Sequence, residues 1–166
     1  DGEPSEAFYH FLGGQQTYCR AAATLVAPYV NSYRRLVAEQ SAPINLDWGQ
    51  DNRTTGLRVP ISAPQARRVE NRVVGADANP YLAIAACLAT GYLGMMQKIR
   101  PREAVQSDSY DRPRELPYGL LEAIEELKGC EPLQEVLGKR RLRLLEALRC
   151  FELPESSREE ARPWLR

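Results

Sequence analysis

A long apolar segment between residues 79 and 96 constrains the fold of this chain more than any other feature. Asn79 is a good helix N-cap and Pro80 suits the first helical position, so the pair predicts a helix from Tyr81 to Met96. The segment is apolar around most of its circumference, and helices of that kind are normally buried. We therefore expect a central helix that the rest of the domain encloses.

The pattern outside this helix predicts a mixture of helices, short strands and loops. Gly13-Gly14 would weaken the first predicted helix by about 1 kcal/mol each relative to alanine, which indicates close approach of another backbone there. Hydrophobic periodicity predicts helices at residues 5–26, 118–128 and 132–150, strands at 44–48, 56–59 and 68–74, an exposed loop at 100–117 and a charged tail at 154–166.

Composition excludes several classes of function. The 166 residues suffice for one domain, and 22 basic residues balance 22 acidic ones, which argues against nucleic-acid or membrane partners. The basic run at 139–143 lies among leucines and is typical of a solvated helix face. No segment is apolar for long enough to span a membrane, so we expect a cytoplasmic protein.

Metal sites built from cysteine or histidine are also not expected. The four cysteines lie at least twenty residues apart, so they form no zinc motif and are predicted to be reduced thiols. His10 is the only histidine, which argues against histidine-based metal sites and against a Ser-His-Asp triad within this chain.

Between Asn31 and Arg72 the chain uses arginine and no lysine. Seven arginines and four acids give this stretch a net charge of +3. Arginine binds carboxylate and phosphate groups through paired hydrogen bonds, which lysine cannot make. Arg68, Glu70 and Arg72 are spaced to share one face of a strand whose other face is mostly valine.

The pattern leaves two interpretations of this charged face open. It is either the solvated side of an edge strand, with Glu70 paired to the arginines beside it, or an anion site in which Glu70 holds a divalent cation. Mg²⁺ between phosphates needs only one or two protein carboxylates. An ATP-dependent ligation would use this arrangement, because arginines can neutralise the transferred phosphoryl group.

An ordered series of motifs resembles the glutamine synthetase family, covering residues 5–100 well and the remainder weakly. A glycine-pair motif at 11–14 (FLGG) also matches a family helix. The motifs stand at residues 31–36 (NSYRRL), 42–43 (AP), 52–60 (NRTTGLRVP), 66–72 (ARRVENR) and 78–82 (ANPYL).

The resemblance implies a role for each matching residue. Arg35 and Arg72 would bind the carboxylates of glutamate. Arg53, the expected catalytic residue, would lie between glutamate and the transferred phosphate, and Arg58 and Arg68 would contact ATP phosphates. Glu70 would bind a catalytic Mg²⁺ or Mn²⁺ ion. The implied reaction is phosphorylation of the glutamate γ-carboxylate by ATP, followed by attack of an amine on the acyl phosphate.

Two departures from the family pattern bear on the amine. The family has a glutamate that helps bind and deprotonate ammonium, and Ser41 stands at its position in this chain. The family also has a lysine at the nucleotide site, and Gln65 stands at its position. The surrounding sequence is more similar to the γ-glutamylpolyamine synthetase branch, which uses putrescine-like amines, and Trp48 either lines an amine channel or belongs to the core. The alternatives are glutamine synthetase proper, with ammonium as acceptor, and a non-catalytic paralogue that binds nucleotide or glutamate.

The resemblance also implies an architecture. Residues 1–153 would be the C-terminal part of a catalytic domain with an α+β fold, in which helices flank an antiparallel sheet, and residues 154–166 would be a charged tail. The other metal-binding carboxylates would lie upstream, so this chain alone would be inactive. The intact protein would be a large homo-oligomer, since family sites lie between adjacent subunits.

Overall fold

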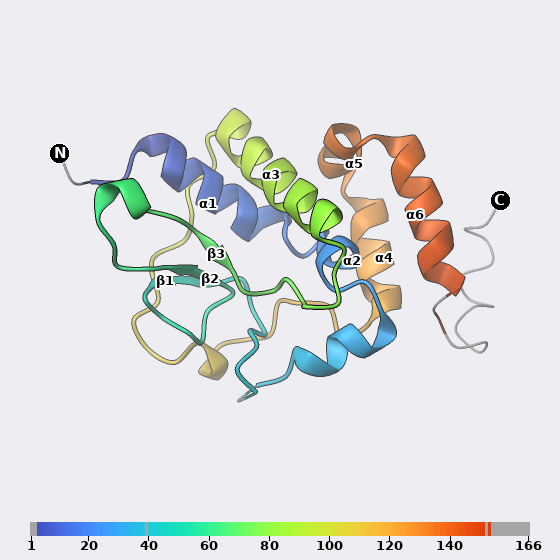
Figure 1. The fold of residues 1–166 in the computed structure, drawn as a ribbon, viewed down its shortest axis with the longest axis horizontal. Helices are drawn as coiled ribbons and strands as arrows, with labels where there is room; N and C mark the ends of the chain where they lie inside the picture. Colours follow the sequence, from blue (N-terminus) through green and yellow to red (C-terminus); the bar gives the residue numbers. More distant parts are fainter. Residues whose placement is uncertain (1–2, 39, 152, 154–166) are drawn as a thin grey trace.

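The computed structural model describes residues 3–38, 40–151 and 153, and it confirms the α+β class. A small sheet lies beneath α1 at one end of the molecule, and α4, α5 and α6 lie at the other end (Figure 1). The helices are α1 (Glu6–Tyr18), α2 (Ala23–Val26), α3 (Pro80–Gln97), α4 (Leu120–Gly129), α5 (Glu131–Leu137) and α6 (Lys139–Phe151). The strands are β1 (Trp48–Gln50), β2 (Leu57–Val59) and β3 (Glu70–Asn71), and short 3₁₀ helices are η1 (Val30–Arg35), η2 (Pro64–Ala66) and η3 (Ser109–Asp111).

The sheet is mixed, which corrects the expectation of a purely antiparallel one. β1 and β2 are parallel, whereas β2 and β3 are antiparallel. The loop from 51 to 56 reverses the chain twice between β1 and β2. Asn52 supports it, because its Oδ1 accepts hydrogen bonds from the backbone N–H and the hydroxyl of Thr54 at 3.0 and 2.8 Å. Such short-range side-chain bonds stabilise turns but leave no hydrophobic period in the sequence.

The predicted strands are longer than the observed ones. Residues 42–49 are all buried, so the apolar alternation at 44–48 belongs to a core segment, and β1 begins only at Trp48. Trp48 is 8% exposed and packs edge-on against Tyr9, which places it in the core. β3 covers two of the seven residues predicted at 68–74, since it pairs only with the short strand β2.

Close contact between α1 and α3 explains the glycine pair in α1. A Cβ atom on Gly14 would lie 2.2 Å from the carbonyl oxygen of Thr90 and 2.6 Å from the Cα atom of Gly94. One on Gly13 would lie 2.2 Å from the carbonyl oxygen of Ile99. The predicted backbone approach is therefore confirmed, and α1 and α3 form the centre of the helical part (Figure 1).

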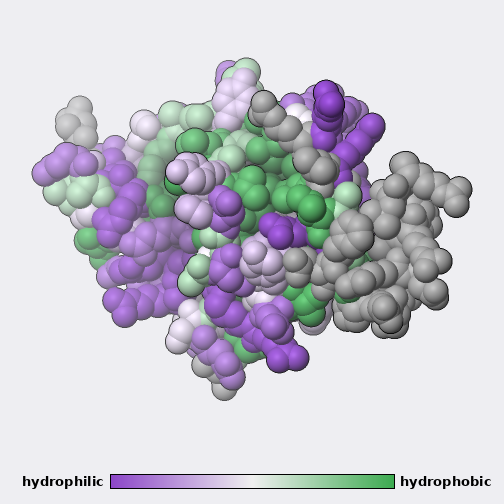
Figure 2. Space-filling view, turned by 45° about the vertical axis from the view of Figure 1, so that its right-hand side comes forward, coloured by the Kyte–Doolittle hydropathy of each residue, from purple (hydrophilic) through white to green (hydrophobic). Residues whose placement is uncertain are grey.

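The start of α3 is confirmed, but its complete burial is wrong. The side chain of Asn79 caps the helix by accepting from the backbone N–H of Tyr81 at 3.0 Å. An outer stripe of large apolar side chains is exposed: Tyr81, Ile84, Leu88, Tyr92 and Met96. Apolar side chains gather in the upper middle of the face drawn in Figure 2. The sequence could not separate the two faces of α3 because both are apolar.

The segment from 100 to 117 is a largely exposed loop apart from η3, as predicted, but it is also tied to the sheet, which was not predicted. The backbone N–H of Val105 donates to the carbonyl of Trp48 at 2.8 Å, and that of Leu116 donates to Ile44 at 3.1 Å. Ser109 is fully buried. The segment therefore covers the free edge of β1, and an uncovered strand edge would expose unpaired backbone groups.

The terminal helices are shorter than predicted. Gly138, whose φ of 91° suits glycine, divides the predicted helix at 132–150 into α5 and α6. The predicted helix at 5–26 is likewise divided, into α1 and α2. Ser5 caps α1 as expected, accepting from the backbone N–H of Phe8 at 3.2 Å. All four cysteines are thiols that form no disulfide, as predicted.

Within the part of the chain that the structure describes, no helix combines the length and apolar character that crossing a membrane requires. The predicted tail at 154–166 lies outside the described residues. The boundary at 153 stays a prediction.

Candidate active site

Arg58 and Glu70 form the centre of the charged face that the sequence singled out. They are cross-strand partners in the antiparallel pairing of β2 with β3, so their side chains lie on the same face of the sheet. One carboxylate oxygen of Glu70 accepts from Nη1 of Arg58 at 2.7 Å, and the other accepts from Nη2 of Arg68 at 3.1 Å. Hydrogen bonds from Arg58, and then from Arg68, hold the pKa of Glu70 below its ordinary value.

A second carboxylate, which the sequence analysis did not select, also contacts Arg58. Nη2 of Arg58 donates to Oδ1 of Asp51, the residue that directly follows β1. Hydrogen bonds to Glu70 and to Asp51 raise the pKa of Arg58. The guanidinium group therefore lies between two acids, one on β3 and one at the end of β1.

Arg72 connects two loops through three backbone carbonyl groups. Its guanidinium group donates to the carbonyl of Arg53, to that of Thr55 at 3.3 Å and to that of Ser41 at 2.9 Å. Burial lowers the pKa of Arg72, and the neighbouring charges that affect it include Arg58, Glu70 and Arg53. Arg72 thus fixes the loop of the divergent position Ser41 next to the charged face.

Arg35 supports the segment that carries Arg72. It is the last residue of η1, and its guanidinium group donates to the carbonyl of Arg72 at 3.4 Å and to the carbonyl of Val73. Burial lowers the pKa of Arg35, with an opposing effect from Asp77. The six predicted site residues thus lie on or beside β2 and β3, and Arg53 and Arg68 are the exposed members.

The charged face offers few ligands for a metal ion. Among the described residues, no group of three histidine, cysteine, aspartate or glutamate side chains is arranged to hold one. Glu70 is about a third exposed, at 31%, so one of its oxygens could reach a cation at the surface. A single carboxylate fits a magnesium ion whose other ligands are phosphate oxygens, water or residues from elsewhere.

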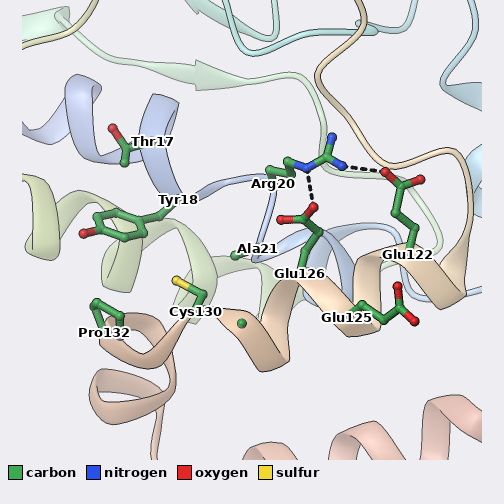
Figure 3. Close-up of a pocket in the computed structure, with 10 residues that line it drawn as sticks. Thr17, Tyr18, Arg20, Ala21, Glu122, Glu125, Glu126, Cys130 and Pro132 are labelled. Carbon is green, nitrogen blue, oxygen red and sulfur yellow. Dashed lines mark hydrogen bonds and ion pairs between the residues drawn. The ribbon is translucent and has the colours of Figure 1, made fainter.

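A separate charged pocket is lined by one arginine and three glutamates, and the arginine pairs with two of them. It encloses about 470 Å³ between the end of α1 and α4 (Figure 3). Arg20 lies between two acids, with Nη2 2.5 Å from Glu122 and Nε 2.8 Å from Glu126. Two further cavities, of about 390 and 270 Å³, lie along α3. None of these three cavities of the described chain is lined by a predicted site residue.

Comparisons with known proteins find relatives that are similar in sequence and in structure. A glutamate–isopropylamine ligase from a Pseudomonas species is 41% identical over 128 residues, which cover 77% of this chain and 28% of that protein. A glutamine synthetase from Thermococcus kodakarensis is 40% identical over 143 residues, covering 81% of this chain and 32% of the relative. The ADP complex of GmaS superposes with a TM-score of 0.79 and 32% identity, over 96% of this chain and 41% of that one.

The chain therefore spans about a third of the length of the curated relatives it matches. The family model for the catalytic domain of glutamine synthetase matches residues 1–165. This match covers nearly the whole chain, including every residue of the charged face. The chain belongs to the glutamine synthetase catalytic-domain family.

Proposed function

We propose that the complete protein carrying this chain is an ATP-dependent ligase that joins the γ-carboxylate of glutamate to an amine. The observation that carries this proposal is the arrangement of Arg58, Arg68, Arg72 and Glu70 around two paired strands, with Arg35 behind them. The names of the two curated relatives, a glutamate–isopropylamine ligase and a glutamine synthetase, support the reaction class.

In the proposed first step, an oxygen of the glutamate γ-carboxylate attacks the γ-phosphorus of ATP. A new P–O bond forms, the bond to the β-phosphate oxygen breaks, and ADP leaves. Arg35 and Arg72 hold the glutamate carboxylates, Arg53 lies near the transferred group, and Arg58 and Arg68 neutralise phosphate oxygens. A Mg²⁺ or Mn²⁺ ion held by Glu70 would supply further positive charge to the phosphates.

In the proposed second step, the amine nitrogen attacks the acyl-phosphate carbon. The C–N bond forms, the C–O bond breaks so that inorganic phosphate leaves, and the nitrogen releases a proton to solvent. Ser41 has no carboxylate to stabilise ammonium or to accept that proton. This favours a larger amine, and we propose a polyamine such as putrescine, which places the protein in nitrogen and polyamine metabolism.

We further propose that the intact protein is a large homo-oligomer and that this chain alone is inactive. The described residues supply at most two carboxylates near the phosphate-binding arginines, Glu70 and Asp51, so further metal ligands would have to come from elsewhere.

Glutamate-dependent ADP release by the complete protein tests the proposal. Putrescine, isopropylamine and ammonium are compared at equal concentration, and putrescine is expected to give the highest rate. A clearly higher rate with ammonium would contradict the polyamine assignment, and a higher rate with isopropylamine would replace it with a monoamine. Tight nucleotide binding without turnover with any amine would instead identify a non-catalytic paralogue.

A further inference from the structure

Asp51 has a backbone conformation that needs an explanation. Its φ of 51° lies in the left-handed region, which aspartate tolerates better than most residues other than glycine. Its backbone N–H donates to the carbonyl of Val59 at 2.9 Å, which continues the pairing of β1 with β2 by one residue. This turn brings the carboxylate of Asp51 back across β2 to Arg58.

The side chain of Arg58 makes its hydrogen bonds through its two terminal nitrogens. Nη1 donates to Glu70 and Nη2 donates to Asp51, whereas Nε is buried without a hydrogen-bond partner. The side chain of Arg58 is only 17% exposed, so water could not easily replace a hydrogen-bond partner that was removed. If Glu70 bound a cation, its oxygens would be shared and the cation would repel the guanidinium group. Asp51 would then be the remaining acid that holds Arg58.

We propose that Asp51 is a positioning residue: it is the second acid bound to Arg58, and it holds the guanidinium group on the charged face when Glu70 gives up its bond to Arg58 and binds a divalent cation. This inference rests on the proposed function, because it takes Glu70 as a metal ligand and Arg58 as a phosphate ligand. Without Asp51, the guanidinium group would pair with Glu70 alone and compete with the cation for the same oxygens.

The test replaces the charge but preserves the turn. Asp51→Asn keeps a side chain that tolerates the left-handed conformation and an oxygen that can still accept from Arg58. Asp51→Gly keeps the backbone freedom and removes the side chain. Glu125→Gln, which removes an exposed acid from α4 near the pocket of Arg20, is the matched control.

The first readout is the free Mn²⁺ concentration at which the complete protein is half-saturated, measured from the electron paramagnetic resonance signal of unbound Mn²⁺. The second is the KM for ATP. Both are expected to rise about tenfold in Asp51→Asn and Asp51→Gly, the size expected when a charge-assisted hydrogen bond is lost. The kcat at saturating metal and ATP is expected to stay within about twofold of the unsubstituted value.

A purely structural role for Asp51 predicts a different pattern, with a lower melting temperature and kcat but an unchanged Mn²⁺ midpoint. That result, or an equal shift in Glu125→Gln, would overturn the inference while leaving the ligase proposal intact. Mn²⁺ binding needs no turnover, so the role of Asp51 can be measured even if no amine is accepted. Absence of any Mn²⁺ binding by the unsubstituted protein would overturn it too.

Discussion

In the helical part of the molecule, α1 and α3 meet backbone to backbone, and glycine is what permits it. Around the sheet, by contrast, segments are joined by long arginine side chains that donate to carbonyl groups and carboxylates. The larger core cluster is built mainly from the helices and their loops. The smaller cluster, between α1 and the sheet, contains four buried residues: Leu12, Trp48, Leu57 and Val59. Stability therefore depends mainly on the first region, and the candidate chemistry on the second.

The two regions also differ in how their arginines are used. Arg20 connects the end of α1 to α4 through two glutamates and the carbonyl of Glu115, so its charge is fully matched. At the sheet, Arg58 is paired with two acids as Arg20 is, but the neighbouring Arg72 and Arg35 donate to carbonyl groups, which are neutral. Their positive charge therefore stays available for an anion, which is what distinguishes a binding surface from a structural ion pair.

The largest expected effect comes from replacing Arg72. Arg72→Ala in the complete protein should lower kcat/KM for glutamate by about a thousandfold, because it removes both a proposed substrate ligand and the link between two loops. The measurement is glutamate-dependent ADP release. Arg72→Lys should not restore activity, since lysine offers a point charge instead of a planar fork. Activity of Arg72→Ala within tenfold of the unsubstituted protein would contradict the assigned role.

The next largest effect concerns the helical region. Gly14→Ala should lower the free energy of unfolding by about 3 kcal/mol, because the new Cβ would meet the backbone of α3 and force the helices apart. Urea denaturation measures the loss. Gly129→Ala is the control, since no atom lies within 4 Å of the added Cβ. An equal loss in both variants would show that the close contact of α1 with α3 does not limit stability.

Much of the fold could be predicted from local sequence signals. Ser5 and Asn79 cap their helices as expected, and the glycine pair in α1 indicated its close neighbour. The outer face of α3 and the pairing of the segment at 100–117 with the sheet could not be predicted, because both depend on tertiary packing. An apolar helix surface does not reveal which side is covered, and the prolines of the segment did not reveal that it pairs with β1.

The candidate site was predictable where it depended on alternation along one strand. Glu70 and its neighbours Arg68 and Arg72 were selected in this way, and the pairing of Glu70 with Arg58 follows from the strand register. Asp51 was missed because a left-handed residue after a strand has no periodic signature. The Asp-Asn pair at 51–52, which is typical of a turn, was the available signal.

Replacing Arg20 tests whether the ion pairs of the helical region serve only to stabilise the fold. Arg20→Met should lower the free energy of unfolding by about 2 kcal/mol, because Glu122 and Glu126 would lose their shared partner in a partly buried pocket. The KM for ATP should not change, since Arg20 lies outside the charged face. A rise in that KM comparable with the effect of Asp51→Asn would show that the two arginine clusters are coupled.

The smallest expected effect is a pH dependence of the free energy of unfolding, which arises from Glu115 in the segment that covers the edge of β1. Glu115 accepts from Arg102 at 2.9 Å and from the backbone N–H of Leu46 at 2.7 Å. Burial alone would raise the pKa of Glu115, but these hydrogen bonds outweigh it and hold the pKa below the ordinary value of 4.5. The folded protein therefore binds this proton less readily than the unfolded chain, and Glu115 stabilises the fold above about pH 4.5.

That contribution should be lost as the pH falls through the lowered pKa of Glu115. Glu115→Gln should cost about 1 kcal/mol at pH 7, as expected for a partly exposed ion pair, and the difference from the unsubstituted protein should shrink towards pH 3. Urea denaturation at pH 7, 5.5, 4.5 and 3.5 measures it. Because Glu70 and other acids titrate in both proteins, only the difference reports on Glu115. A difference that stays constant across this range would mean that Glu115 stabilises the covering segment through its shape and neutral hydrogen bonds, with no contribution from its charge.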